Sequence, residues 1–326
     1  MRVTPILRTA AAATGLVLGA AALTACGSSP TGDDELTVVA STNVWGSVAQ
    51  AVAGDFVQVE SIIEDPSADP HSYEASPADA AALIDASLVV YNGGGYDHFV
   101  DDVVAGDTDQ RSVAAFDLFE DGAHAGESHD HGTDDHDHGT DDHDHDHGHS
   151  HGAVNEHVWY DPATAIAVAH AVADNLAALD PANAEAYERN AMSFESGMAA
   201  VTDITGEIAQ NHPGARVAQT EPIAQYLIEG AQLTDATPEE FQNAIENGTD
   251  PSPTSIAAAR GLIGDGSVEA LVYNIQTEDR VTQDLRAVAE QAGVPVVEVT
   301  ETLPEGVDYI RWQTEAAQSL ATALDR

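Results

Sequence analysis

Short apolar runs alternate with amphipathic stretches along the chain from about residue 36. The runs LTVVAS (36–41) and FVQVESII (56–63) are rich in valine and isoleucine, which predicts buried strands. Between them, NVWGSVAQAVAGD (43–55) predicts a helix that ends at Gly54. Strands that alternate with helices indicate a parallel sheet with helices on its faces.

The same alternation continues beyond the second strand and begins again after Gly214. SPADAAALIDA predicts a helix with Ser76 as its N-cap and Pro77 in its first turn, and SLVVYNGGG predicts a strand that ends in a glycine turn. In the later series, the predicted strands are ARVAQT, ALVYN and VPVVEVT. The predicted helices there are PIAQYLIEGA, RVTQDLRAVAEQAG and a last helix from about Tyr309.

The longest amphipathic pattern lies between the two series, in PANAEAYERNAMSFESGMAAVTDITGEIAQ. Its large apolar positions recur in steps of three, four and seven: Tyr187, Ala191, Phe194, Met198, Val201 and Ile208. A helix of that length would be about 45 Å long. We therefore expect an α/β protein of two lobes, 36–180 and 213–326, each with a mainly parallel sheet flanked by helices, joined by one long rigid helix at 181–212.

The first 26 residues, MRVTPILRTAAAATGLVLGAAALTAC, have a positive start, a short apolar run and small residues at the end. This pattern predicts a signal peptide at 1–25. Residues 23–26 (LTAC) resemble a bacterial lipobox, which implies that Cys26 is lipidated and that 26–35 form a polar tether; an ordinary secretory signal is the alternative. Cys26 is the only cysteine, so no disulfide is expected. We expect the protein to be extracytoplasmic and lipid-anchored to the outer face of the cell membrane.

The formal net charge is −46, and the chain contains no lysine. Nucleic acid is therefore excluded as a partner, because binding to phosphates requires a basic surface. The acidic surface suits cations, although much of it serves only solvation.

Residues 124–151 hold ten of the 15 histidines together with nine acidic residues and no large apolar side chain. HDHGTDD occurs there twice in succession, at 129–135 and 136–142. We expect this segment to be disordered and to bind metal weakly at many interchangeable histidine pairs, in a manner that depends on pH. The histidines of this auxiliary metal-binding loop are His129, His131, His136, His138, His143, His145, His147, His149 and His151.

Several stretches in order along the chain resemble the solute-binding lipoproteins of bacterial zinc and manganese ABC importers. They are STNVWGSVAQAVAGD, DPHSYEASPADAAALIDASLVVYNGGG, EHVWYDP, DPANAEAYERNAMSF and TEPIAQYLIEGAQL. DPHSYE together with HVWYDP is specific, whereas either alone would be weak. The resemblance implies two α/β lobes with one metal ion held in the cleft between them.

The resemblance also implies the metal ligands. His71 lies in DPHSYE, His157 in EHVWYDP, and Glu221 in QTEPIAQY, where family members carry histidine or glutamate. The fourth position aligns with Glu278, with Asp279 as its substitute, although manganese-type members use aspartate there. Two imidazoles with one or two carboxylates suit Zn²⁺, and Mn²⁺ with wider coordination.

Zinc and manganese are both compatible with this ligand set. The carboxylates favour Mn²⁺, whereas the histidine-rich segment favours Zn²⁺, and we expect zinc as the cargo. The resemblance implies a monomer that delivers the ion to an ABC permease and its ATPase. The alternative function is that of a metal-buffering or chaperone lipoprotein that is not coupled to a permease. An enzyme is not expected, because the chain has no HExxH motif and no nucleophile–base pair.

Overall fold

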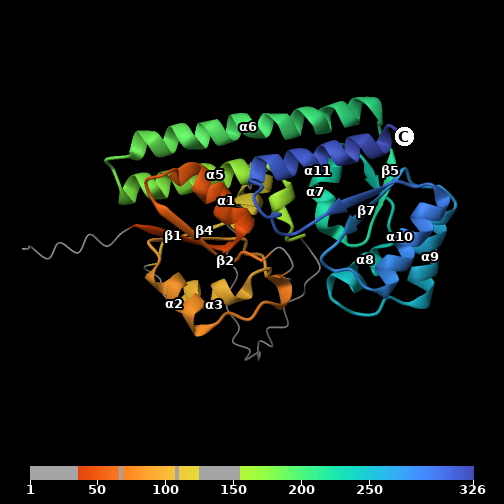
Figure 1. Cartoon of the computed structure of the whole chain (residues 1–326), viewed down its shortest axis with the longest axis horizontal. Helices are drawn as coiled ribbons and strands as arrows, with labels where there is room; N and C mark the ends of the chain where they lie inside the picture. Colours follow the sequence, from red (N-terminus) through yellow and green to blue (C-terminus); the bar gives the residue numbers. More distant parts are fainter. Residues whose placement is uncertain (1–35, 66–67, 69, 107–109, 125–154) are drawn as a thin grey trace, which may run out of the picture. The chain divides into compact units, whose positions relative to one another are not determined.

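Two four-stranded sheets, all of whose strand pairs are parallel, form the framework of the protein (Figure 1). The computed structural model describes residues 36–65, 68, 70–106, 110–124 and 155–326. The first sheet has the order β2-β1-β3-β4, from β1 (Thr37–Thr42), β2 (Gln58–Ile63), β3 (Leu88–Tyr91) and β4 (Ser112–Ala114). The second has the order β6-β5-β7-β8, from β5 (Arg216–Gln219), β6 (Thr234–Asp235), β7 (Ala270–Asn274) and β8 (Val296–Val299).

Helices connect the strands in both sheets. Those that precede the second sheet are α1 (Asn43–Ala53), α2 (Pro77–Asp85), α3 (His98–Gly106), α4 (Ala115–His124), α5 (Pro162–Leu179) and α6 (Ala184–Asn211). Those within and after the second sheet are α7 (Gln225–Gly230), α8 (Glu239–Glu246), α9 (Pro253–Gly264), α10 (Arg280–Ala292) and α11 (Tyr309–Leu324). Three single 3₁₀ turns are η1 (Pro70–Ser72), η2 (Val158–Tyr160) and η3 (Pro222–Ala224). The predicted α/β class with two parallel sheets is confirmed.

Side chains of the first sheet alternate between two apolar layers, as the period of two of a strand requires. Val38 and Val90 belong to the large core that also includes α1 and α5. Val39 and Val89 belong to a smaller core with Leu83 of α2 and with α3. Both faces of the sheet are thus covered, which accounts for the continuous apolar runs in its strands.

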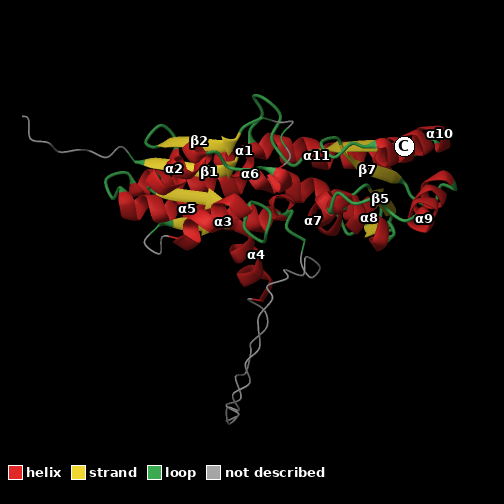
Figure 2. Ribbon diagram, turned by 90° about the horizontal axis from the view of Figure 1, so that it is seen from below, coloured by secondary structure: helices red, strands yellow, loops and turns green. Residues whose placement is uncertain are grey.

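The second sheet has the same two-faced arrangement. Val217 and Val272 join the large core together with residues of α6, α7 and α11. Leu271 and Tyr273, on the opposite face, pack with Phe241 of α8 and with α9 and α10. Figure 2 shows the helices on both sides of the strands. The large core is therefore continuous from one sheet to the other.

Helix α6 is the long helix that the sequence predicts, and it packs against α5, α1, α11 and α7 (Figure 1). All six apolar positions of the predicted stripe are buried. Helix α5 is long and apolar enough to cross a membrane by length and composition, but its packing against α6 and α1 is that of a core helix.

The turn after β3 is fixed by a buried carboxylate. Asp97 accepts hydrogen bonds from the backbone N–H groups of Asn92 at 2.7 Å and Gly93 at 2.8 Å. Burial raises the pKa of Asp97 to about 6 against the effect of these hydrogen bonds. Asn92 in turn accepts from the indole N–H of Trp45 and donates to the carbonyl of Glu156. This network fixes the backbone next to His157.

Candidate metal centre

His71 lies in η1, which follows the carboxyl end of β2, and its side chain is 26% exposed. Its Nε2 atom is 3.5 Å from Oε2 of Glu301 and 3.7 Å from Oε1 of Glu246. The ring packs edge-on against Tyr96, with centroids 4.8 Å apart. His71 of the first lobe therefore faces carboxylates that come from the second.

His157 is fully buried immediately before η2, and Asn155 orients it. The Oδ1 atom of Asn155 accepts from the backbone N–H of His157 at 2.8 Å and lies 2.6 Å from the Nδ1 atom of its ring. The Nδ2 atom of Asn155 donates to the carbonyl of Pro222 and to Gln225, which assigns the orientation of the amide. Because an amide oxygen can only accept, the ring proton is assigned to Nδ1. The lone pair on Nε2 is thereby left for another partner.

The Nε2 atom of His157 has no hydrogen-bond partner among the described residues, and it lies 3.5 Å from Oε1 of Glu246. Burial, and secondly the nearby His71, hold the pKa of His157 well below its ordinary value. The imidazole is therefore neutral at neutral pH, which is the form that binds a metal ion.

Glu221 and Glu301 follow the carboxyl ends of β5 and β8, and both are buried. The Nδ2 atom of Asn274 donates to Oε1 of Glu301 at 3.0 Å and also to Oε1 of Glu221. Thr277 is 2.9 Å from both oxygens of Glu221, and Tyr96 donates to Glu301 at 3.2 Å. Burial, and secondly the charge of Glu301, raise the pKa of Glu221 to about 7.

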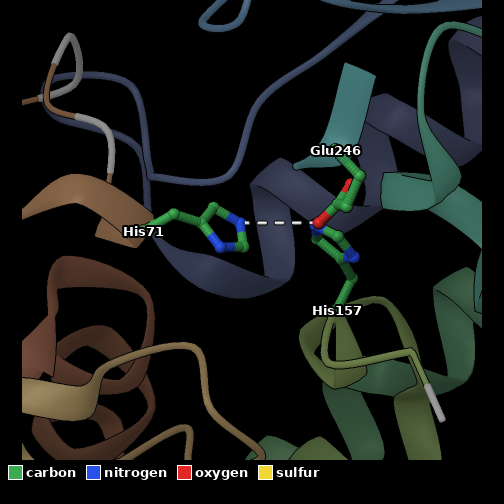
Figure 3. Close-up of side chains that lie close together, drawn as sticks. All are labelled: His71, His157 and Glu246. Atoms are coloured by element: carbon green, nitrogen blue, oxygen red, sulfur yellow. Dashed lines mark ion pairs between the residues drawn. The ribbon is translucent and has the colours of Figure 1, made fainter. Parts of the chain in front are cut away.

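Glu246 is the last residue of α8, and its side chain points toward both histidines (Figure 3). His71, His157 and Glu246 each have one ligand atom within 4.8 Å of the others. Ligand atoms placed tetrahedrally about 2.0–2.2 Å from an ion are roughly 3.3–3.6 Å apart. The separations of 3.5 and 3.7 Å at Glu246 are close to these values.

The structure does not bring Glu278, the predicted fourth ligand, into this cluster. The Oε1 atom of Glu278 accepts a hydrogen bond from the hydroxyl group of Tyr273 at 3.0 Å. Tyr273 belongs to the core between the second sheet and α10. The carboxylate of Asp279 caps α10 by accepting from the N–H groups of Val281 and Thr282. Glu301, which the sequence pattern did not single out, lies 3.5 Å from the Nε2 atom of His71.

A cavity of about 880 Å³ opens over these side chains. The ionisable residues that line it are His71, His98, Glu156, Glu221, Glu239, Glu246, Asp250, Asp279 and Glu301. No arginine is among the described residues of this lining. The seven acidic side chains outnumber the two histidines among these residues, which favours the entry of cations into the cavity over that of anions.

Two further sets of predicted site residues lie outside the described part of the chain. These are Cys26 and the histidines of the auxiliary loop from His129 to His151. The backbone of His124 ends α4. Three further described histidines lie outside the predicted ligand set: His98 lines the cavity, His170 pairs with Glu195, and His212 pairs with Asp325.

Two parallel α/β sheets whose connections bring histidines and carboxylates together are typical of the substrate-binding proteins of metal ABC importers. Comparison with known families supports this class, since the family model described as zinc-uptake complex component A, periplasmic, matches residues 38–323. The chain belongs to this family. Its members are substrate-binding components of transporters and not enzymes, as the sequence predicted.

Individual relatives include proteins named for each metal. The high-affinity zinc uptake system protein ZnuA of Yersinia pestis is 30% identical over 180 residues, which are 50% of this chain and 52% of that protein. The manganese ABC transporter substrate-binding lipoprotein PsaA of Streptococcus anginosus is 24% identical over 322 residues, 95% of this chain and 97% of that protein. The structure of FpvC from Pseudomonas aeruginosa in complex with Mn²⁺ superposes with a TM-score of 0.67 at 19% identity, covering 89% of this chain and 98% of that one. This structural similarity shows that the two proteins share a fold.

Proposed function

We propose that this protein captures a divalent transition metal ion, most favourably Zn²⁺, outside the cytoplasm and delivers it to the permease and ATPase of an ABC importer. The observation that carries the proposal is the buried, neutral His157, whose Nε2 atom faces His71 and Glu246 beside an acidic cavity. The names of the relatives, which are importer components for zinc or for manganese, support the same role.

The proposed ligands are His71 and His157 from the first lobe and Glu221 and Glu301 from the second. Glu301 replaces the predicted Glu278 in this proposal, because Glu301 lies 3.5 Å from His71 whereas Glu278 accepts a hydrogen bond from Tyr273. Two nitrogen and two oxygen donors complete a tetrahedral site without a catalytic water. The ion would hold the lobes 36–180 and 213–326 together across the helix region 181–212, in which α6 lies.

Zinc is proposed ahead of manganese because the histidine-rich residues 124–151 are of use chiefly to a metal that binds imidazole. Their proposed role is to gather or sense zinc for the cavity. Mn²⁺, or both metals, is the alternative cargo, supported by the carboxylates of the site and by the manganese lipoprotein among the relatives. A lipoprotein that buffers metal ions without delivering them to a permease is the alternative function.

Anchoring through a lipid on Cys26, after removal of residues 1–25, is proposed from the lipobox-like sequence, and relatives named as lipoproteins support it. The protein would then work as a monomer on the outer face of the cell membrane. Metabolic labelling with a radioactive fatty acid, in cells that express the wild type or Cys26→Ser, tests the anchor.

The proposed function is tested on a protein that lacks residues 124–151. We expect it to remain folded and to bind one Zn²⁺ tightly, because the proposed ligands all lie outside the deletion. Isothermal calorimetry with Zn²⁺, and then with Mn²⁺ in competition, measures the number of ions and the preference. Loss of all tight binding contradicts the cavity as the site, and several tight ions in the full chain favour the buffering protein.

Metal binding is expected to release a proton from Glu221. Its pKa of about 7 means that this carboxyl is mostly protonated at pH 6 in the empty protein, whereas a bound cation requires the carboxylate. The wild type should therefore release roughly one proton more than Glu221→Gln at pH 6, and almost none more at pH 8. Calorimetry in buffers of different ionisation enthalpy measures this difference. Equal release by the two proteins at pH 6 would refute the assignment.

The raised pKa of Glu221 also makes the stability of the metal-free protein decrease as the pH rises. The empty folded protein binds the proton of Glu221 more tightly than the unfolded chain does. The contribution of Glu221 to the free energy of unfolding is therefore greatest below pH 4.5 and decreases as the pH rises from there to about 7. A bound divalent cation removes this loss, because it stabilises the carboxylate.

A further inference from the structure

Glu246 is outside the proposed ligand set, yet it is the carboxylate that faces both histidines. Its Oε1 atom is 3.5 Å from Nε2 of His157 and 3.7 Å from Nε2 of His71. The side chain is 14% exposed and lines the cavity, and Figure 3 shows it directed between the two imidazole rings. The fully buried Nε2 of His157, which has no hydrogen-bond partner among the described residues, is aimed at the same point.

Helix α8 holds Glu246 in this place. Phe241 and Ile245 of α8 are buried in the core of the second sheet, and Gln242 donates to Asp235 at 2.6 Å. The helix ends immediately after Glu246, and the turn that follows has a positive φ at Gly248. The position of the carboxylate therefore follows from the packing of α8 on the sheet.

Glu221 and Glu246 lie differently with respect to the two histidines. Both oxygens of Glu221 lie at hydrogen-bonding distance from Thr277, and Oε1 also accepts from Asn274. Glu246 instead lies at the separations expected for ligands of one ion with both imidazoles. Glu301 has the matching separation of 3.5 Å from His71. An ion bound between the two histidines is thus within reach of Glu246.

We propose that Glu246 binds the captured ion directly, as a carboxylate supplied by α8, and that it decides how well the site holds Mn²⁺ relative to Zn²⁺. This inference rests on the proposed function. Two histidines with Glu221 and Glu301 already satisfy Zn²⁺, which prefers four ligands. Mn²⁺ accepts more oxygen ligands and a larger coordination number, so an added carboxylate favours it more. Glu246 makes the site one that accepts both metals.

The test compares three variants of the full chain. Glu246→Gln removes the charge and weakens the ligand. Glu246→Asp keeps the charge but withdraws the carboxylate by one methylene group. Glu239→Gln is the matched control, because Glu239 lies on the same helix and lines the same cavity. The affinities for Mn²⁺ and Zn²⁺ are measured by calorimetry, with a competing chelator for Zn²⁺, and circular dichroism checks the fold.

We expect both Glu246 variants to bind Mn²⁺ about 10- to 100-fold more weakly and Zn²⁺ less than about 10-fold more weakly, with little change in Glu239→Gln. If Glu246→Asp binds as the wild type does, or if Glu246→Gln and Glu239→Gln lose affinity equally, Glu246 acts only through its charge and the inference is overturned. Equal losses for both metals overturn its part in selectivity. A wild type that binds neither metal instead refutes the proposed function itself.

Discussion

Replacing His157 by alanine is expected to weaken Zn²⁺ binding by on the order of 100-fold or more, because the change removes a neutral, oriented nitrogen donor that no neighbouring side chain can replace. The pKa of His157, held low by burial, and the hydrogen bond from Nδ1 to Asn155 prepare Nε2 for this role before the ion arrives. Competition with a chromophoric chelator measures the affinity.

The matched control is His170→Ala. The side chain of His170 on α5 is 42% exposed and pairs with Glu195, so its loss should leave the affinity for Zn²⁺ unchanged. His71→Ala should behave as His157→Ala does. An unchanged affinity in either variant would remove that residue from the ligands. Circular dichroism of each variant separates the loss of a ligand from the loss of the fold.

The second large effect concerns stability. Trp45 of α1 is fully buried, and its indole N–H donates to Oδ1 of Asn92 at 3.2 Å. Trp45→Ala should lower the free energy of unfolding by about 3–5 kcal/mol, because it leaves a cavity between α1 and β3 and removes the donor to a buried amide. Urea denaturation of the metal-free protein measures the change.

Ile84→Ala is the control for Trp45→Ala, since Ile84 is 57% exposed on α2. Its substitution should change the free energy of unfolding by less than about 1 kcal/mol. If Trp45→Ala cost as little as the control, the network from Trp45 through Asn92 to the backbone of Glu156 would not support the region next to His157.

Local sequence patterns predicted most of the fold because each of these elements carries its own signal. The capping residue Ser76 and Pro77 begin α2, Gly54 ends α1, and the run ALVYN is the whole of β7. The stripe of six apolar residues that predicts α6 is buried throughout. Helix α8 was not predicted, because only three of its eight residues are apolar.

The candidate site was predicted less completely, because its carboxylates come together only through the topology. Glu221 and Glu301 each follow a strand at its carboxyl end, and this rule could have suggested Glu301 from the run VPVVEV before it. Glu278 also follows a strand, but the turn after Asn274 directs it toward the hydroxyl group of Tyr273. Glu246 has no strand before it, and only the packing of α8 brings it near the histidines.

The amide of Asn274 between Glu221 and Glu301 has a consequence for the permease. Below pH 7, Glu221 of the metal-free protein retains a proton, because burial and secondly the charge of Glu301 raise its pKa to about 7 despite the hydrogen bond from Asn274. Exchange of that proton for a divalent cation changes the charge of the cavity by one unit and not by two. A permease that distinguishes the loaded from the empty protein therefore meets only a small difference in charge, and the discrimination must depend more on the arrangement of the surface around the cavity.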